Sequence, residues 1–159
     1  MKQLWAPWRL AYVQEAGAAV GCVFCQEAAG ELGDRSLVVH RGERVVVLLN
    51  KFPYSSGHLM VAPVRHVPAL GDLEHDEAAE IHDLTVQGIA ALSRIYAPDG
   101  FNVGWNLGAV AGGSIAAHLH EHVVPRWAGD TNFMPVLADV KVLPEHLEST
   151  RLNLIEAWQ

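Results

Sequence analysis

The sequence predicts an α+β fold in which an antiparallel meander of short strands is covered on one face by one long helix. Three observations predict it. β-Branched runs separated by tight turns fill residues 36–64, apolar residues recur at helical spacing over residues 72–96, and strand-like segments return after residue 100. Strands on both sides of a single helix, with mostly hairpin connections, are typical of α+β domains.

Length and composition agree with one globular domain over residues 1–159. Half of the 159 residues are hydrophobic and 18% are charged, which excludes a disordered chain. The formal net charge of −7 argues against broad nucleic-acid binding. No apolar run approaches the about 20 residues of a membrane-spanning helix, and the N-terminus lacks the apolar stretch of a signal peptide. We therefore expect a cytoplasmic protein that binds neither nucleic acid nor membranes.

The first elements follow from local composition. Residues 1–35 mix aromatic and small residues with glycine and predict an irregular N-terminal arm. Two β-branched runs, 36–40 and 45–49, flank Arg-Gly-Glu-Arg and predict a hairpin. Pro, Ser and Gly in residues 51–57 indicate a loop, after which residues 58–64 return as a strand.

The long helix is predicted with Asp72 as its N-cap, because acidic residues follow it in the first turn. Apolar residues at a period near 3.6 continue to about Tyr96, and the Pro-Asp-Gly at 98–100 ends the helix. We therefore expect one amphipathic helix that packs on one face of the sheet.

The C-terminal half completes the sheet. Strands are predicted over residues 101–107 and 118–125, with a glycine-rich turn at 108–113 between them. Residues 128–159 are expected to form an extension that ends in a short helix, starting near Pro144.

Three histidines alternate at the start of the last predicted strand: His118, His120 and His122. Residues two apart share one face of a strand, roughly 6.6 Å from each other. A lone histidine is usually structural, and this strand half could simply face solvent. Imidazole, however, can attack phosphorus when neutral and donate a proton when charged, so three on one rigid element favour a catalytic site.

The two cysteines, Cys22 and Cys25, form a Cys-x-x-Cys motif. From the residues alone it is a redox pair, half of a zinc site, or two unrelated buried thiols. A disulfide is disfavoured in a reducing compartment, and nothing around the motif indicates the βαβ unit of a thioredoxin-like pair. Zinc needs four ligands, of which this motif supplies two.

The His-x-His-x-His-x-x stretch of residues 118–124 resembles the signature of the histidine triad (HIT) nucleotide hydrolases and transferases. Residues 49–63 are similar to the family's Asn-x-x-Pro-x-x-x-Gly-His-x-Leu-x-x-Pro block, and residues 102–108 fit the strand before the triad. The resemblance implies a HIT-like fold.

A subgroup resemblance covers the two ends of the chain. Residues 4–13 and 125–135 look like those of bacterial HIT proteins of the diadenosine tetraphosphate phosphorylase type. Two departures from the family pattern stand out. Glu121 replaces an apolar residue, and Gly-Ser at 113–114 replaces the commoner Gly-Gln.

The resemblance implies that His120 is the nucleophile and forms a nucleotidyl-histidine, while His122 and Ser114 donate to phosphate oxygens. The implied substrate-binding residues are Asn50, Asn106, Gly112, Gly113, Ser114 and His122. Candidates for contacts to the distal phosphates or second base are Arg9, Lys51, Arg126 and Trp127. His58 is expected to position the triad rather than to react.

Zinc-bearing members of the family complete their site with the histidine of a Pro-x-x-His segment and with the first triad histidine. The resemblance therefore implies a closed structural zinc site of four protein ligands, Cys22, Cys25, His66 and His118. Such a site would tether the N-terminal arm to the catalytic strand. In the alternative, both histidines merely bond backbone carbonyls.

The implied activity is cleavage of dinucleoside polyphosphates such as diadenosine tetraphosphate by phosphorolysis to ADP and ATP, with inorganic phosphate as acceptor. One alternative is a hydrolase of such compounds or of nucleoside phosphoramidates that uses water. A second is a nucleotide-binding module without turnover. The family commonly pairs across two-fold axes, so a homodimer is expected, and no redox or organic cofactor is indicated.

Overall fold

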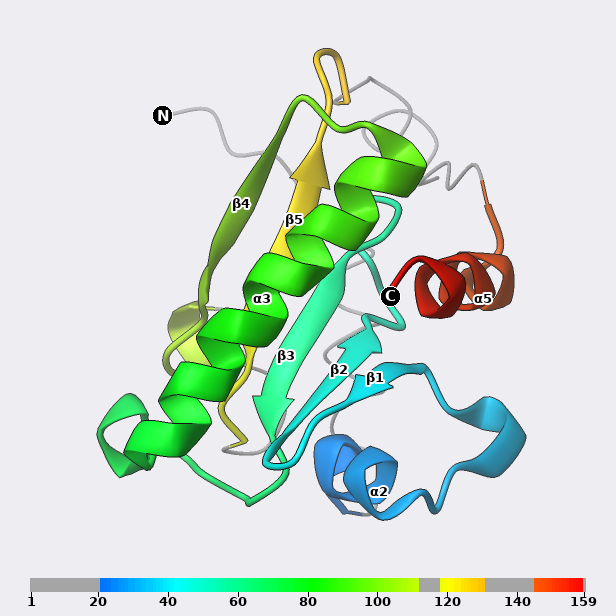
Figure 1. The fold of residues 1–159 in the computed structure, drawn as a ribbon. Coiled ribbons are helices and arrows are strands. Elements are labelled where there is room, and N and C mark those ends of the chain that lie inside the picture. Colours follow the sequence, from blue (N-terminus) through cyan, green and yellow to red (C-terminus); the bar gives the residue numbers. More distant parts are fainter. Residues whose placement is uncertain (1–20, 112–117, 131–144, 159) are drawn as a thin grey trace.

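The computed structural model describes residues 21–111, 118–130 and 145–158 (Figure 1). Five strands form one antiparallel sheet in the order β1-β2-β3-β5-β4. The strands are β1 (Val38–Arg41), β2 (Val45–Leu49), β3 (Leu59–Pro63), β4 (Gly100–Trp105) and β5 (Glu121–Arg126). The predicted α+β class is confirmed.

The meander is interrupted once. Strands β1, β2 and β3 follow each other as neighbours, and helix α3 (His75–Tyr96) then carries the chain to the far edge of the sheet, where β4 lies. Strand β5 returns between β3 and β4, so His122 pairs with Met60 on one side and with Gly104 on the other. The triad strand is therefore central, which removes the alternative of a solvent-facing edge.

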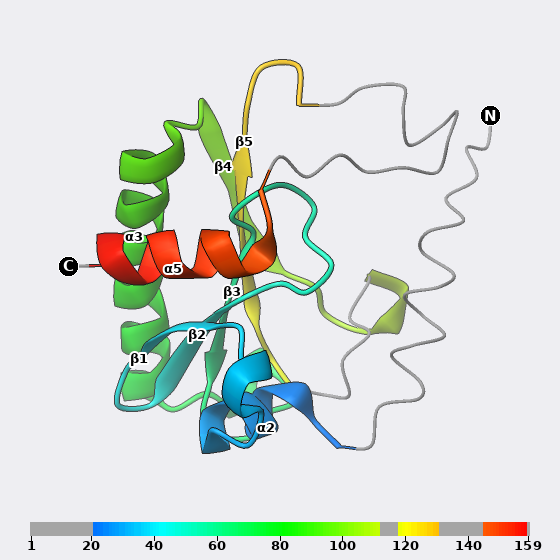
Figure 2. The ribbon, with the colours of Figure 1, turned by 90° about the vertical axis from the view of Figure 1, so that its right-hand side faces the viewer.

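Successive side chains along the strands point alternately to two faces of the sheet, and both faces are apolar. Val45, Val47 and Leu49 belong to the core under α3, which lies across one face of the sheet (Figures 1 and 2). Val46 and Leu48 belong to a second cluster on the opposite face. The strands are thus buried on both sides, and the second face is the one that carries the histidines.

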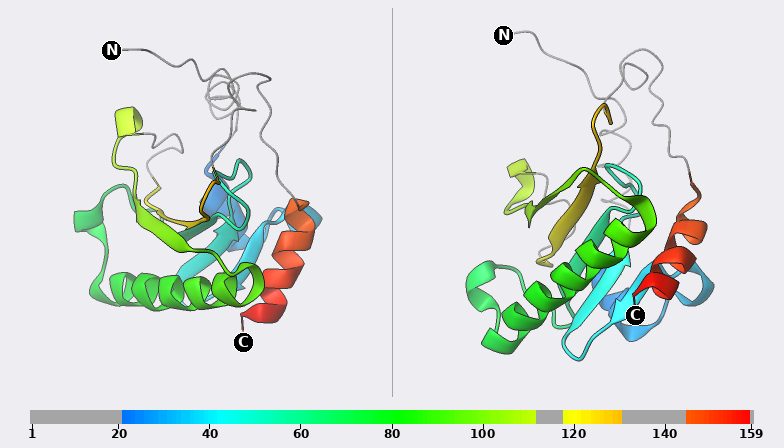
Figure 3. Two further views of the ribbon diagram at one scale, coloured as in Figure 1. Left: turned by 90° about the horizontal axis from the view of Figure 1, so that it is seen from above. Right: turned by 45° about the horizontal axis from the view of Figure 1, so that its top comes forward.

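Two further helices flank the sheet. Helix α5 (Leu147–Ala157) confirms the predicted C-terminal helix and packs beside α3 over β1, where Leu154 is buried (Figure 3). Helix α2 (Val23–Ala29) contributes Phe24 to the second cluster, on the face away from α3. No helix within the described ranges is long and apolar enough to cross a membrane.

The N-terminal arm differs from the prediction. Residues 1–20 lie outside the described residues, but residues 23–29 form α2 and residues 33–35 form a 3-10 turn instead of irregular chain. A helix of seven residues is too short to be stable alone, so packing rather than sequence period determines it. Its anchor is Glu27, whose carboxylate accepts hydrogen bonds from the Ser36 hydroxyl (2.6 Å) and the Leu37 amide (2.8 Å).

Helix α3 begins two residues later than predicted. Its N-cap is Glu74, whose backbone N–H donates to Glu77 Oε2 at 2.9 Å as part of a capping box. Asp72 instead lies in a separate 3-10 turn, Leu70–Asp72. A reciprocal cap satisfies two free donors at once, and this outweighs a single N-cap side chain.

Strand β5 also begins later than predicted, at Glu121 rather than at His118. Strand β3 ends at Pro63, and β3–β5 pairing stops at Val61 and Glu121. Residues 118–120 instead bond to the loop that follows β3, where the Leu119 amide donates to Val67 O at 2.7 Å. The triad therefore spans the junction between a loop-bound segment and a strand.

Candidate functional site

The three triad histidines lie together and are buried, with exposed fractions of 2%, 8% and 9% for His118, His120 and His122. The rings of His120 and His122 meet edge to face, with centroids 4.8 Å apart. Burial of imidazoles in this way disfavours their charged form. Accordingly, the pKa of each of the three is lowered, chiefly by burial.

Among the described residues, only one ring nitrogen of His120 has a hydrogen-bond partner. Its Nδ1–H donates to the carbonyl oxygen of His118 at 2.8 Å. A neutral imidazole carries one proton, so Nε2 keeps its lone pair. Because burial also lowers the pKa of His120, the ring stays neutral near pH 7 and Nε2 is available as a nucleophile.

His122 has the opposite arrangement, which is set by His58. The Tyr54 amide donates to His58 Nδ1 at 3.0 Å, so His58 carries its proton on Nε2. That Nε2–H donates to His122 Nδ1 at 2.9 Å. His122 Nδ1 is therefore an acceptor, and the single proton of neutral His122 lies on Nε2.

The amide of Asn106 lies beside that proton, with Nδ2 3.1 Å from His122 Nε2. Because His122 Nε2 carries the proton, Asn106 must accept it through its amide oxygen. A rotation of the Asn106 amide by 180° exchanges its oxygen and nitrogen and occupies the same space. Burial, and then the nearby His120, lowers the pKa of His122 to about 4. The site therefore offers a neutral N–H donor next to a neutral nitrogen nucleophile.

The position of His58 depends on the turn before it. Gly57 has φ of +76°, and a Cβ there would lie 2.6 Å from Leu92 Cδ2 on α3. Glycine permits both the left-handed backbone and this close approach. His58 is fully buried, and the Tyr54 ring packs 4.7 Å from it, so His58 cannot turn away from His122.

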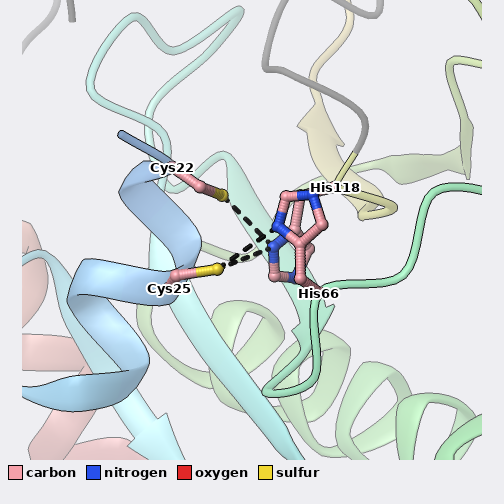
Figure 4. A group of neighbouring side chains, drawn as sticks. All are labelled: Cys22, Cys25, His66 and His118. Carbon is pink, nitrogen blue, oxygen red and sulfur yellow. Dashed lines mark hydrogen bonds between the residues drawn. The ribbon is translucent and has the colours of Figure 1, made fainter. Parts of the chain in front are cut away.

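The first triad histidine faces a different group. His118 Nε2–H donates to Pro63 O at 2.8 Å, which leaves the Nδ1 lone pair directed at the two cysteines. Nδ1 lies 3.2 Å from Cys22 Sγ and 3.6 Å from Cys25 Sγ (Figure 4). His66 Nδ1 lies 3.3 Å from Cys25 Sγ.

These four side chains can hold a metal ion. Their donor atoms all lie within 4.8 Å of one another. In a tetrahedral site with Zn–S near 2.3 Å and Zn–N near 2.0 Å, donor atoms are roughly 3.3–3.8 Å apart, close to the contacts seen here. Burial, and next the neighbouring Cys22, raises the pKa of the Cys25 thiol, so a cation must displace protons to bind.

Two of the segments that supply these four side chains are anchored by other contacts. Cys22 and Cys25 lie at the start of α2. Arg41 of β1 holds the C-terminal end of this helix, because its guanidinium donates to Ala28 O at 3.0 Å. His66 follows β3, and its neighbour Arg65 donates to Glu77 Oε2 at 2.7 Å and to Oε1 at 3.0 Å. The His66 loop is thus tied to the start of α3 without help from a metal.

Comparison with known proteins agrees with this geometry. The HIT domain model matches residues 33–129, more than half of the chain. The chain belongs to the histidine triad family. It is 42% identical over 165 aligned residues to the AP-4-A phosphorylase of Mycobacterium tuberculosis, covering 99% of this chain and 85% of the relative. It is 32% identical to the protein hit of Bacillus subtilis, covering 72% and 77%.

Solved structures of HIT proteins share the fold. A zinc-bound histidine triad family protein from Mycobacterium smegmatis has a TM-score of 0.71 and 25% identity, covering 87% of this chain and 93% of its own. A histidine triad nucleotide-binding protein from Sulfolobus tokodaii has a TM-score of 0.71 and 27% identity, covering 86% and 91%.

Part of the expected substrate-binding set lies outside the described residues, namely Gly112, Gly113 and Ser114. Asn106 is placed at His122, as described above. Asn50 follows β2, and its Oδ1 accepts from the Phe52 amide at 2.9 Å. Asn50 therefore supports the turn with its oxygen, and its amide nitrogen is the donor that it can offer a ligand.

The candidates for contacts to the distal phosphates or second base contact other protein groups where the structure describes them. Arg126 forms an ion pair with Asp130 and also donates to Asn102 Oδ1 at 2.7 Å, while the Trp127 indole N–H donates to Tyr96 O. Lys51 lies with Nζ 5.4 Å from the centre of the Phe52 ring. Arg9 lies outside the described residues.

The structure shows how the fold accommodates Glu121, where the family pattern has an apolar residue. Its side chain lies on the α3 face, where Oε2 accepts a hydrogen bond of 2.6 Å from the buried hydroxyl of Thr85. Threonine on the covering helix thus supplies the partner that a carboxylate behind the triad strand needs.

One residue at the site has no counterpart in the sequence prediction. Phe24, inside the Cys-x-x-Cys motif, packs its ring against both His118 (5.1 Å) and His120 (4.7 Å). An aromatic residue between two cysteines is an ordinary local pattern. Nothing local indicates contact with residues more than 90 positions away.

Proposed function

We propose that this HIT protein is an enzyme that cleaves diadenosine tetraphosphate by phosphorolysis, giving ADP and ATP. The observation that carries the chemistry is the hydrogen bond from His120 Nδ1–H to His118 O, which leaves Nε2 as the free, neutral nitrogen. The choice of substrate and of phosphate as acceptor follows the AP-4-A phosphorylase to which nearly the whole chain is similar.

In the first step, His120 Nε2 attacks the α-phosphorus of one adenylate group. A P–N bond forms, the bond from that phosphorus to the bridging oxygen breaks, and ATP leaves with the electron pair. The adenylated imidazole gains positive charge, and the His118 carbonyl, which already accepts the Nδ1 proton, stabilises it. His122 Nε2–H donates to a phosphate oxygen as negative charge builds there.

In the second step, an oxygen of inorganic phosphate attacks the same phosphorus. The P–N bond breaks, its electron pair returns to Nε2, and ADP is released. Splitting one displacement into two through a covalent intermediate lowers the barrier of each. His120 is regenerated with its proton still on Nδ1, so no external base is needed to reset it.

The remaining site assignments are part of this proposal. Ser114 is assigned as a second donor to phosphate oxygens, and Asn50 as a ribose ligand through its amide nitrogen. The amides of Gly112, Gly113 and Ser114 are assigned to the phosphates, because glycine allows close backbone approach. Asn106 is assigned to the substrate site through its contact with His122. In the absence of substrate its amide oxygen accepts the Nε2 proton of His122.

The cation proposed for Cys22, Cys25, His66 and His118 is zinc, in a structural role. Two thiolates and two imidazoles are a typical zinc ligand set, and a site closed by four protein ligands leaves no position for a reacting water. When bound, zinc would cross-link α2 to the triad segment. The free thiols of this site suit a reducing compartment, so a cytoplasmic location is proposed with it.

We further propose that the protein is a homodimer that pairs through β4. In the described ranges β4 bonds to β5 along one edge and to no strand along the other. Its Val103 is 45% exposed, and open apolar edges favour pairing with a second strand. Light scattering on Val103→Arg should then show a monomer where the wild type shows a dimer; equal masses would contradict pairing at this edge.

The experiment that tests the activity is product analysis by ion exchange. Diadenosine tetraphosphate is incubated with the protein, with and without inorganic phosphate. ADP and ATP formed only with phosphate would establish phosphorolysis. AMP and ATP formed in both samples would make the enzyme a hydrolase. Absence of products in both would overturn the proposed substrate and favour a nucleotide-binding module.

A further inference from the structure

Phe24 joins the metal-ligand cluster to the nucleophile. It lies between Cys22 and Cys25 in the first turn of α2 and is fully buried. Its ring plane is tilted by 44° to His118 and by 35° to His120, with centroids 5.1 Å and 4.7 Å away. One side chain thus contacts a metal ligand and the proposed nucleophile at once.

The His120 ring has few other restraints. The bond from Nδ1–H to His118 O fixes one edge, and the His122 ring meets it at 70°. Rotation about the side-chain torsions would move Nε2 away from the phosphorus while leaving the backbone in place. Phe24 packs against this ring with centroids 4.7 Å apart, so a rotation toward α2 would bring the ring into Phe24.

The two ends of α2 are held by different means. The C-terminal end is anchored to β1 and the preceding residues by Glu27, which accepts from Ser36 and Leu37, and by Arg41. The N-terminal end starts at Cys22, which makes no side-chain capping bond. The first turn packs on the sheet through Phe24, and its Cys22 and Cys25 face His118 and His66 in the segments beside the sheet.

We propose that Phe24 is a positioning residue for His120, and that through Phe24 the placement of His120 depends on metal bound by the cysteines and histidines beside it. This inference rests on the proposed function, because it assigns His120 as the nucleophile. Its structural part, the restraint of the His120 ring, can be measured without turnover.

The test compares Phe24→Leu with Val23→Ala. Val23 lies between the same cysteines and packs against the same apolar cluster, so it controls for loss of packing in α2. For Phe24→Leu we expect unchanged zinc content, a kcat lower by about tenfold and a KM within about twofold, because a displaced nucleophile slows chemistry more than binding. For Val23→Ala, kcat and KM should both stay near the wild-type values.

Nuclear magnetic resonance of ¹⁵N-labelled histidine reads the restraint directly. The His120 Nδ1 proton should exchange with water faster in zinc-loaded Phe24→Leu, and faster in wild type after chelation of zinc, while it stays protected in Val23→Ala. Equal exchange and equal kcat in Phe24→Leu and Val23→Ala would overturn the positioning role. Unchanged exchange in chelated wild type would overturn the dependence on metal. If wild type fails to cleave diadenosine tetraphosphate, the proposed substrate fails, but the exchange measurement still decides this inference.

Discussion

The two ends of the triad segment use the same side chain in opposite ways. At the metal end, His118 donates Nε2–H to Pro63 O and presents a lone pair on Nδ1. At the other end, His122 accepts at Nδ1 from His58 and presents a proton on Nε2. Both rings are buried and neutral, so burial does not distinguish them. The partner of the second ring nitrogen does, because it determines which nitrogen carries the proton.

His120 lies between these two and shares features of each. Like His118 it donates to a backbone carbonyl, and its ring meets the ring of His122 edge to face. The histidine motif therefore supplies three imidazoles, while two backbone carbonyls and His58 determine which nitrogen of each ring carries the proton. Variants directed at the His118 end should leave the His122 end unchanged, and the reverse.

The largest effect is expected for His120→Ala, which removes the proposed nucleophile between the two ends. Cleavage of diadenosine tetraphosphate should fall by at least about 10⁴-fold, since loss of a covalent nucleophile removes the two-step route. Zinc content and the unfolding transition should stay close to wild type. The exposed His82 on α3 offers a matched control as His82→Ala. Retention of substantial activity in initial-rate assays would contradict the assignment.

Cys22→Ser should affect the metal end and, through Phe24, His120, while the His122 end stays unchanged. The variant loses one thiolate ligand, so metal analysis should show reduced zinc and the melting temperature should fall by roughly 10 °C, through loss of the bound ion. The hydrogen bond between His58 and His122 should persist in nuclear magnetic resonance spectra. Full zinc occupancy at wild-type stability would contradict a four-ligand site.

His58→Ala should affect the other end alone. Without the donor at Nδ1, His122 is free to take the other tautomer and lose its Nε2 proton, so kcat should fall by about 10²-fold. Zinc content should not change. His40→Ala on β1 controls for removal of a partly buried imidazole elsewhere in the sheet. The measurement is kcat together with the ¹⁵N shifts of His122, which report its tautomer.

Acid should destabilise the fold through His122. Its pKa is about 4 in the folded protein, against about 6.5 in an unfolded chain. Between these values the unfolded state binds more protons, so the free energy of unfolding falls as pH drops from 6.5 toward 4. A loss of about 2 kcal/mol is expected by pH 5. Denaturant titrations at pH 7.5 and 5 check it, and a matching loss in His122→Gln would contradict this source.

The smallest effect is expected for a change on the α3 face of the sheet, away from both ends of the triad. Thr85→Val removes the hydroxyl that donates to Glu121 and should cost about 1 kcal/mol of stability. Cleavage rate and zinc content should stay within about twofold of wild type. Ser93→Ala on the same helix is the control, because Ser93 is exposed. A loss of activity without loss of stability would assign Glu121 a part in catalysis.

Much of the site could be predicted because its members lie in recognisable patterns. The alternating histidines and the Cys-x-x-Cys motif can be recognised in the sequence itself, and the family resemblance added His66 to the predicted metal ligands. The proton positions could not be predicted, because they depend on carbonyls of His118 and Pro63 that only the folded chain brings near.

The fold was predictable where the chain is periodic and not where packing decides. Helix α3 repeats an apolar face over six turns, whereas α2 is short and depends on Phe24 and Glu27 for its contacts. The late start of β5 follows from the end of β3 at Pro63, a constraint between segments 55 residues apart. Local composition carries no trace of such pairings.

The spacing of the metal ligands along the chain has a consequence for folding during synthesis. Cys22 and His118 are 96 residues apart, and His118 bonds to Pro63 O at the end of β3, just before β5 begins. A nascent chain that has completed α2 and the first hairpin holds both thiols but lacks this ligand. All four side chains of this cluster can therefore meet only after residue 118 has been synthesised, so a chain that ends in the first hairpin cannot assemble the cluster.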